Sequence, residues 1–156
     1  NNQNSNFKKI KLLIVGNMVH SRGEIQKFAE KYKTDDNIIF TGMVSNKDLQ
    51  TLMSQALFFI HPSLYEGFGM PIIEAMDNGI PVTCSNAASL PEVAGDAALF
   101  FNPEDVDSIE SAIKIVTENS NLRQQLIERG HEHAQKFTNT NEMADEYIKL
   151  FEKTMR

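Results

Sequence analysis

The sequence predicts an α/β fold: a Rossmann-like parallel sheet with helices on both faces, followed by a run of helices. Three observations carry this prediction. Short apolar runs alternate with segments in which apolar residues recur at helical spacing. The apolar runs are continuous, which is typical of strands buried on both faces of a sheet. Beyond Phe101 only the helical spacing remains, so we expect the sheet to end there.

The predicted strands are short apolar runs bounded by turn-forming residues. They cover residues 11–15, 37–40, 56–60, 81–84 and 98–101. The predicted helices lie at residues 23–33, from the N-cap Ser45 onward, from Pro71 to Gly79, at 90–93, and at 105–118, 121–136 and 141–153. Because the carboxyl ends of parallel strands meet at one edge, the loops after the first three strands should share one ligand-binding rim.

The length and composition are those of one globular domain. The chain has 156 residues, of which 41% are hydrophobic and 23% charged. We expect a single domain at residues 10–156, preceded at residues 1–9 by a flexible leader or fragment boundary rich in Asn and Ser. The net charge of −6 and the scattered basic residues argue against a nucleic-acid-binding protein.

Cysteine usage and hydropathy indicate a cytoplasmic protein. Cys84 is the only cysteine, so no intramolecular disulfide can form, and its apolar neighbours predict a buried core residue. No apolar run approaches the roughly 18 residues of a membrane-spanning helix.

The segment from Glu66 to Pro71 carries the strongest indication of chemistry. Gly67 and Gly69 flank Phe68 immediately before a predicted helix. Glycine lets the backbone approach a ligand closely. The first amides of a helix lack intrahelical partners, and the helix dipole favours an anion there. We therefore predict an anion-binding loop in which each hydrogen bond from a backbone amide to a diphosphate oxygen contributes roughly 1.5–3 kcal/mol.

Two of the three side chains considered near this loop, Glu74 and His61, stay open to more than one interpretation. Glu74 falls in the first turn of the predicted helix, where its carboxylate either caps the helix or accepts the hydroxyls of a ribose. Glu66 has no helix to cap and is better placed to bond sugar hydroxyls. His61, at the end of the third strand, bonds either the backbone or a bound ligand.

Glu66 and Glu74 belong to a longer pattern. Seven residues separate them within E-G-F-G-x-P-x-x-E-A, and L-P-E-V follows downstream. The combination resembles the E-x7-E signature of the retaining GT-B glycosyltransferases, and most closely the group 1 (GT4) hexosyltransferases. The resemblance covers nearly the whole chain beyond Lys8.

The resemblance implies a role for each residue of the pattern. Glu66 would be the catalytic-site carboxylate that bonds the donor-sugar hydroxyls, and Glu74 would bind the ribose. The loop amides would meet the donor sugar and diphosphate: Gly67, Phe68, Gly69 and Met70. Residues after the first two strands would meet the nucleotide and its base: Gly16, Met43 and Val44.

The implied reaction transfers a hexose from a nucleotide diphosphate sugar to a glycan, lipid or other acceptor with retained configuration, as in polysaccharide biosynthesis. The donor is a substrate; no cofactor is implied, and the residues present require no metal. The family binds its acceptor in an N-terminal domain and neutralises the diphosphate with an upstream Arg/Lys pair. Neither is recognisable here, so we expect a fragment of a two-domain enzyme that is inactive alone. Any peripheral membrane association would come through the missing domain.

Two other functions remain open. A non-catalytic nucleotide-sugar-binding module would use the same loop, although it would have no need of Glu66. Another GT-B enzyme, such as a sugar-nucleotide epimerase, fits the E-G-F-G-x-P loop less well. The base and sugar of the donor, and the acceptor, are not predicted.

Overall fold

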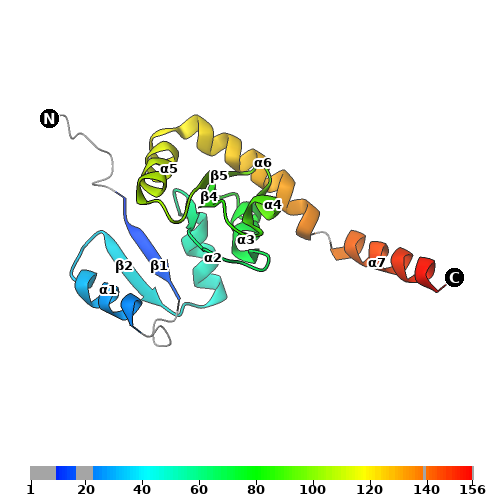
Figure 1. The fold of residues 1–156 in the computed structure, drawn as a ribbon, viewed down its shortest axis with the longest axis horizontal. Coiled ribbons are helices and arrows are strands. Elements are labelled where there is room, and N and C mark those ends of the chain that lie inside the picture. The colour runs from blue at the N-terminus through cyan, green and yellow to red at the C-terminus, as the bar shows by residue number, and fades with distance from the viewer. Residues whose placement is uncertain (1–9, 17–22, 139, 156) are drawn as a thin grey trace. The chain divides into compact units, whose positions relative to one another are not determined.

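The computed structural model describes residues 10–16, 23–138 and 140–155 (Figure 1). The predicted leader at residues 1–9 lies outside the described residues. Contacts divide the chain into two compact units, one ending at Leu52 and the other beginning at Met53. The single domain expected at residues 10–156 stays a prediction.

The first unit contains a pair of parallel strands and a helix. β1 (Leu12–Val15) pairs with β2 (Ile38–Gly42), and α1 (Glu24–Tyr32) connects them. The Phe28 ring on α1 lies 6.2 Å from the Phe40 ring on β2, in an edge-on arrangement. The helix therefore packs on the sheet through aromatic rings, as the helical spacing of residues 23–33 predicts.

The helix that follows β2 begins where the sequence predicts. α2 spans Asn46–Ser54. The Ser45 hydroxyl accepts a hydrogen bond from the amide of Asp48 at 3.1 Å and donates one to the Asp48 carboxylate at 2.7 Å. These reciprocal bonds confirm Ser45 as the N-cap.

The second unit is built on three parallel strands in the order β3-β4-β5, at Phe59–His61, Val82–Ser85 and Ala98–Phe101. Helices connect and follow these strands: α3 (Met70–Asp77), α4 (Leu90–Ala94), α5 (Val106–Glu118), α6 (Ser120–Thr138) and α7 (Thr140–Thr154). The parallel strands, the connecting helices and the helical end of the chain confirm the predicted α/β class.

The boundary of one predicted strand was wrong. The two units contain sheets of two and three parallel strands. β3 begins at Phe59 rather than Ala56, because its ladder extends only as far as its partner. β3 pairs with residues from Val82 onward, and Pro81, which has no amide to donate, precedes that strand.

The hydrophobic core of the second unit lies around α3, β4 and α4. Ile72 and Met76 on α3, Val82 on β4 and Leu90 on α4 are fully buried. α6 packs on α3 at close range, because a Cβ at Gly130 would lie only 3.1 Å from Met76 Cγ. No helix among residues 10–16, 23–138 and 140–155 combines the length and apolar character needed to cross a membrane.

Candidate functional site

The loop between β3 and α3 turns sharply at Gly69. This residue is the N-cap of α3 and adopts a left-handed conformation, with φ 97° and ψ 40°, which glycine adopts without strain. A Cβ at this position would lie 2.6 Å from Leu90 Cδ2, and Leu90 is fully buried. Glycine is therefore required at position 69 both by the backbone and by the packing of α4.

The amides from Gly67 to Met70 have no hydrogen-bond partner among the described residues. The first amide near this turn that is bonded within the chain belongs to Ile72, which donates to the Gly69 carbonyl at 3.0 Å. Within the described part of the chain, the amides of Gly67, Phe68, Gly69 and Met70 donate to no protein atom. They lie at the N-terminus of α3, where the helix dipole favours an anion.

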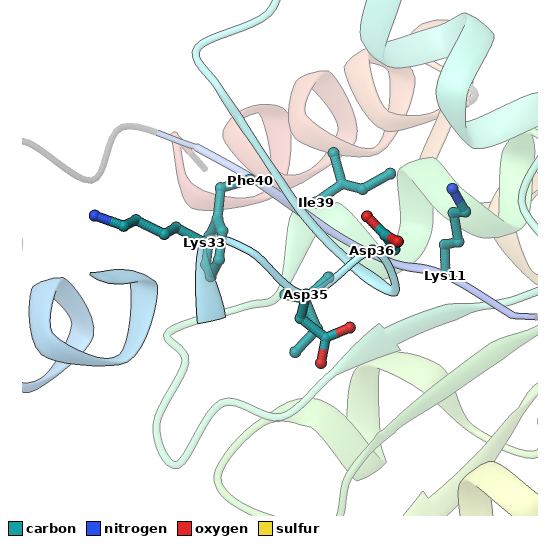
Figure 2. Close-up of a pocket in the computed structure, with 7 residues that line it drawn as sticks. Lys11, Lys33, Asp35, Asp36, Ile39 and Phe40 are labelled. Atoms are coloured by element: carbon teal, nitrogen blue, oxygen red, sulfur yellow. The ribbon is translucent and has the colours of Figure 1, made fainter. Parts of the chain in front are cut away.

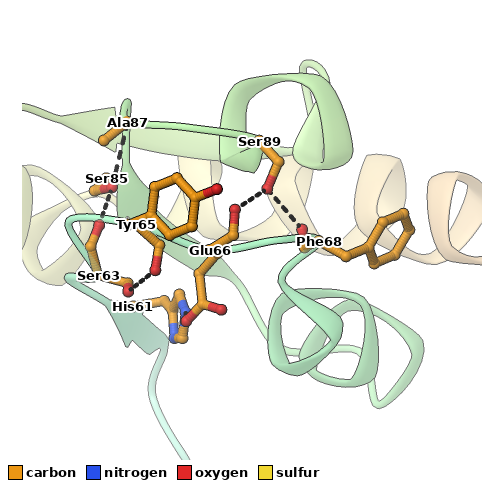
Figure 3. A network of polar contacts seen from close by, with 8 residues as sticks. All are labelled: His61, Ser63, Tyr65, Glu66, Phe68, Ser85, Ala87 and Ser89. Atoms are coloured by element: carbon orange, nitrogen blue, oxygen red, sulfur yellow. Dashed lines mark hydrogen bonds and ion pairs between the residues drawn. The ribbon is translucent and has the colours of Figure 1, made fainter.

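The carbonyl groups of the same loop are held by serine side chains, as Figure 3 shows. The Ser89 hydroxyl lies 2.9 Å from the Glu66 carbonyl oxygen and 3.3 Å from that of Phe68. The Ser85 hydroxyl donates to the Ser63 carbonyl at 2.6 Å. Protein donors therefore satisfy carbonyls of this loop, while the amides of the glycine segment are left without partners.

The Glu66 side chain has a partner that the sequence did not indicate. Its Oε1 atom lies 3.0 Å from Nε2 of His61, the last residue of β3 (Figure 3). The two side chains are partly buried, with exposed fractions of 16% for His61 and 33% for Glu66. His61 was expected to bond the backbone or a ligand; instead it bonds the predicted catalytic-site carboxylate.

Glu74 lies farther along α3 than predicted. α3 begins at Met70 rather than at Pro71, so Glu74 is its fifth residue, and its first turn contains no acidic residue. The side chain is exposed, and its carboxylate has no partner among the described residues. The helix-capping interpretation of Glu74 loses its support, because the dipole effect is confined to the first turn.

The residues predicted to meet the nucleotide and base lie in the first unit. The Gly16 amide donates to the Gly42 carbonyl at 3.1 Å, so Gly16 and Met43 lie together at the carboxyl ends of β1 and β2. Met43 is exposed, and Val44 is half-buried. The structure thus brings these three predicted residues together within their own unit.

A surface hollow in the first unit is lined by Lys11, Lys33, Asp35, Asp36, Ile38, Ile39 and Phe40 (Figure 2). Lys11 precedes β1 and Ile38 begins β2, so this hollow includes the amino ends of the strands and none of the predicted site residues. The described residues contain no group of three or more His, Cys, Asp or Glu side chains that could hold a metal ion.

Cys84 is buried, as predicted, and is not a nucleophile of the site. It lies on β4 in register with His61, and it is fully inaccessible to solvent. Burial raises the pKa of its thiol to about 12, because the thiolate would be desolvated.

The sequence did not indicate that the hydroxyls of Ser85 and Ser89 bond the carbonyls of this loop. Ser89 precedes L-P-E-V, a segment that the resemblance included. Its hydroxyl bridges 23 residues to Glu66, a separation at which helical and strand periodicity carry no information. The downstream motif was therefore the only signal for it.

Comparison with known proteins agrees with this fold. The family model described as "Glycosyl transferases group 1" matches residues 2–133, more than half of the chain. The O-antigen chain mannosyltransferase B of Escherichia coli is 46% identical over 101 residues, covering 65% of this chain and 26% of that protein. The O-antigen chain mannosyltransferase RfbU of Salmonella typhimurium is 37% identical over 103 residues, covering 66% and 29% of the two chains.

Solved structures share the fold. Sucrose-phosphate synthase from Thermosynechococcus elongatus superposes with a TM-score of 0.78 at 26% identity, covering 93% of this chain and 38% of that one. Anabaena Alr3699/HepE in complex with UDP gives a TM-score of 0.82 at 16% identity, with 93% and 41% covered. The chain spans about a quarter of the curated relatives quoted above. It has the fold of the C-terminal domain of GT-B glycosyltransferases and belongs to the group 1 glycosyl transferases.

Proposed function

We propose that the loop at residues 66–70 holds a nucleotide diphosphate sugar, and that the chain is the donor-binding part of a retaining hexosyltransferase. One observation carries this proposal: within the described structure, the amides of Gly67, Phe68, Gly69 and Met70 have no protein partner, and they lie at the N-terminus of α3. Peptide amides at a helix N-terminus bind phosphate oxygens without any basic side chain. This suits a chain with a net charge of −6.

Gly67 adds independent support for a ligand at this loop. Its φ is not positive, and a Cβ at this position would meet no protein atom within 4 Å. Neither backbone strain nor internal packing therefore requires glycine here. Close approach of a ligand to the backbone does require it.

The two carboxylates take different parts of the donor in this proposal. Glu66 bonds the hydroxyls of the sugar, and Glu74 bonds those of the ribose. Support for the ribose role is the exposed position of Glu74 beyond the first turn of α3, where helix capping does not explain it. Gly16, Met43 and Val44 of the first unit are proposed to meet the nucleotide and its base.

The chemistry follows from the donors of the loop. Transfer breaks the bond between the anomeric carbon and a diphosphate oxygen, and negative charge accumulates on the departing diphosphate. Preorganised amides stabilise such developing charge. We propose that no further cofactor is needed. We also propose that the acceptor site belongs to an N-terminal domain, and that the Arg/Lys pair lies near the start of the donor-binding domain, upstream of β1.

The relatives suggest the class of donor and the setting. Those quoted above are named as O-antigen mannosyltransferases, and one structural neighbour is bound to UDP. We therefore propose a role in polysaccharide biosynthesis, with mannosyl donors to be tested first. We place this activity in the cytoplasm, where a chain with one buried thiol needs no oxidising environment.

Titration of the chain with UDP-, GDP- and ADP-sugars, followed by amide NMR, tests the proposal because the method measures millimolar affinities. The amide signals of Gly67 to Met70 should shift with at least one donor. Glu74→Ala should lower the affinity of the chain for that donor roughly tenfold. Asp77→Ala, which removes an exposed carboxylate from the same helix, should not. If no donor shifts the loop signals, the proposed function is wrong.

A further inference from the structure

The contact between His61 and Glu66 assigns a role to a residue outside the glycine loop. His61 ends β3 and pairs in register with Cys84 on β4. Its ring stacks on the Phe59 ring, with centroids 5.9 Å apart and planes inclined by 22°. Only 16% of the His61 side chain is exposed to solvent, so its surroundings in the protein restrict the orientation of the imidazole.

The geometry fixes which atoms make the contact. A carboxylate only accepts hydrogen bonds, so His61 Nε2 carries the proton and donates it to Glu66 Oε1 at 3.0 Å. Among the described residues no protein donor reaches Oε2 of Glu66. One oxygen of the carboxylate is therefore occupied by the protein, and the other is available to a ligand hydroxyl.

Glu66 is held at its backbone as well as at its side chain. The Ser89 hydroxyl donates to the Glu66 carbonyl at 2.9 Å. A glutamate side chain has several rotamers in solution, and ordering it on ligand binding opposes affinity. The bond from His61 removes part of that cost before the ligand arrives.

We propose that His61 is a positioning residue: it orients the Glu66 carboxylate so that Oε2 meets a hydroxyl of the donor sugar. This inference rests on the proposed function, since it assumes that Glu66 bonds the sugar. It predicts that His61 contributes to binding of the sugar and not of the nucleoside diphosphate, because its only polar side-chain contact in the described structure is Glu66.

A pair of substitutions separates the donated hydrogen bond from mere packing. Glutamine places its amide nitrogen at the same number of bonds from Cα as His Nε2, whereas the shorter asparagine matches Nδ1. His61→Gln should keep the bond to Glu66, and His61→Asn should lose it. We expect His61→Asn to lower the affinity of the chain for UDP-glucose or GDP-mannose, whichever one binds, roughly three- to tenfold. His61→Gln should stay within about twofold of the wild type.

A double-mutant cycle ties the effect to Glu66. Glu66→Ala should weaken the same nucleotide sugar roughly tenfold, and adding His61→Asn to it should weaken binding no further. UDP and GDP should bind all these variants as they bind the wild type, which also verifies that the variants are folded.

The possible failures can be told apart. Equal donor affinity in His61→Asn and the wild type, or a full additional loss in the double variant, would overturn the positioning role while leaving the proposed function intact. A wild-type chain that binds no nucleotide sugar would overturn both. Weaker binding of UDP or GDP by His61→Asn would indicate a general structural role and would also overturn the inference.

Discussion

The conformation of Gly69 and the open space at Gly67 predict opposite outcomes for two otherwise identical substitutions. An alanine at position 69 would adopt φ near 97°, at a cost of about 1–2 kcal/mol. Its Cβ would also lie 2.6 Å from Leu90 Cδ2. Because Leu90 is fully buried, moving it aside overpacks the core at a cost of about 1–3 kcal/mol.

Gly69→Ala should therefore lower the free energy of unfolding by roughly 2–5 kcal/mol. For a chain of this length that corresponds to a fall in Tm of about 4–20 °C. Gly67→Ala should leave the free energy of unfolding unchanged or raise it by about 0.4–1 kcal/mol, since its Cβ meets no protein atom within 4 Å.

The assay is thermal unfolding of both variants, combined with donor titration of Gly67→Ala. If Gly67 is a glycine because a ligand approaches it, this stable variant should bind the donor at least tenfold more weakly, a loss of about 1.4 kcal/mol. A Gly69→Ala variant as stable as the wild type would refute the steric reasoning. A Gly67→Ala variant that binds the donor normally would refute the argument from ligand approach.

Three further residues test the surroundings of the site. Thr83→Val should raise the free energy of unfolding by about 1–3 kcal/mol in calorimetry, because the buried Thr83 hydroxyl has no hydrogen-bond partner among the described residues; Thr83→Ser, which keeps the hydroxyl, should not. Cys84 should resist a thiol reagent at pH 8 until urea unfolds the chain. Since burial raises the pKa of the folded thiol from its ordinary value of 9.0 to about 12, the contribution of this burial to stability is fully present below pH 9. Between pH 9 and 12 the unfolded thiol ionises first, so that contribution falls by about 1.4 kcal/mol per pH unit, and Cys84→Ala should lack this slope. Ser89→Ala should lower the free energy of unfolding by about 1 kcal/mol, whereas Ser63→Ala, whose exposed hydroxyl donates to only the Tyr65 carbonyl among the described residues, should lower it less.

Local patterns predicted the elements well wherever a local signal exists. Ser45 was expected as the N-cap of α2, and its hydroxyl accepts the expected amide. The start of β3 was not predictable in the same way. Phe59 is the first residue of the ladder because its partner strand, β4, begins only after Pro81. The periodicity of residues 56–60 does not reveal which strand is the partner or where that strand begins.

The site divides along the same line. Free amides could be expected from Gly67, Gly69 and the helix that follows, because backbone geometry is a local property. The contacts that hold the loop are not local: the hydroxyl of Ser89 reaches Glu66 across 23 residues. Even the bond from His61, only five residues away, depends on side-chain rotamers, which spacing alone does not determine.

The reliance of this loop on peptide groups bears on how its sequence can diverge. Every residue except proline supplies a backbone amide, so mutational drift at positions 68 and 70 would leave the donors in place. The loop conformation depends instead on Gly69, with Leu90 behind it, and on the bond from Ser89 to the Glu66 carbonyl. Side chains around the loop could therefore change while the same backbone amides remain in place.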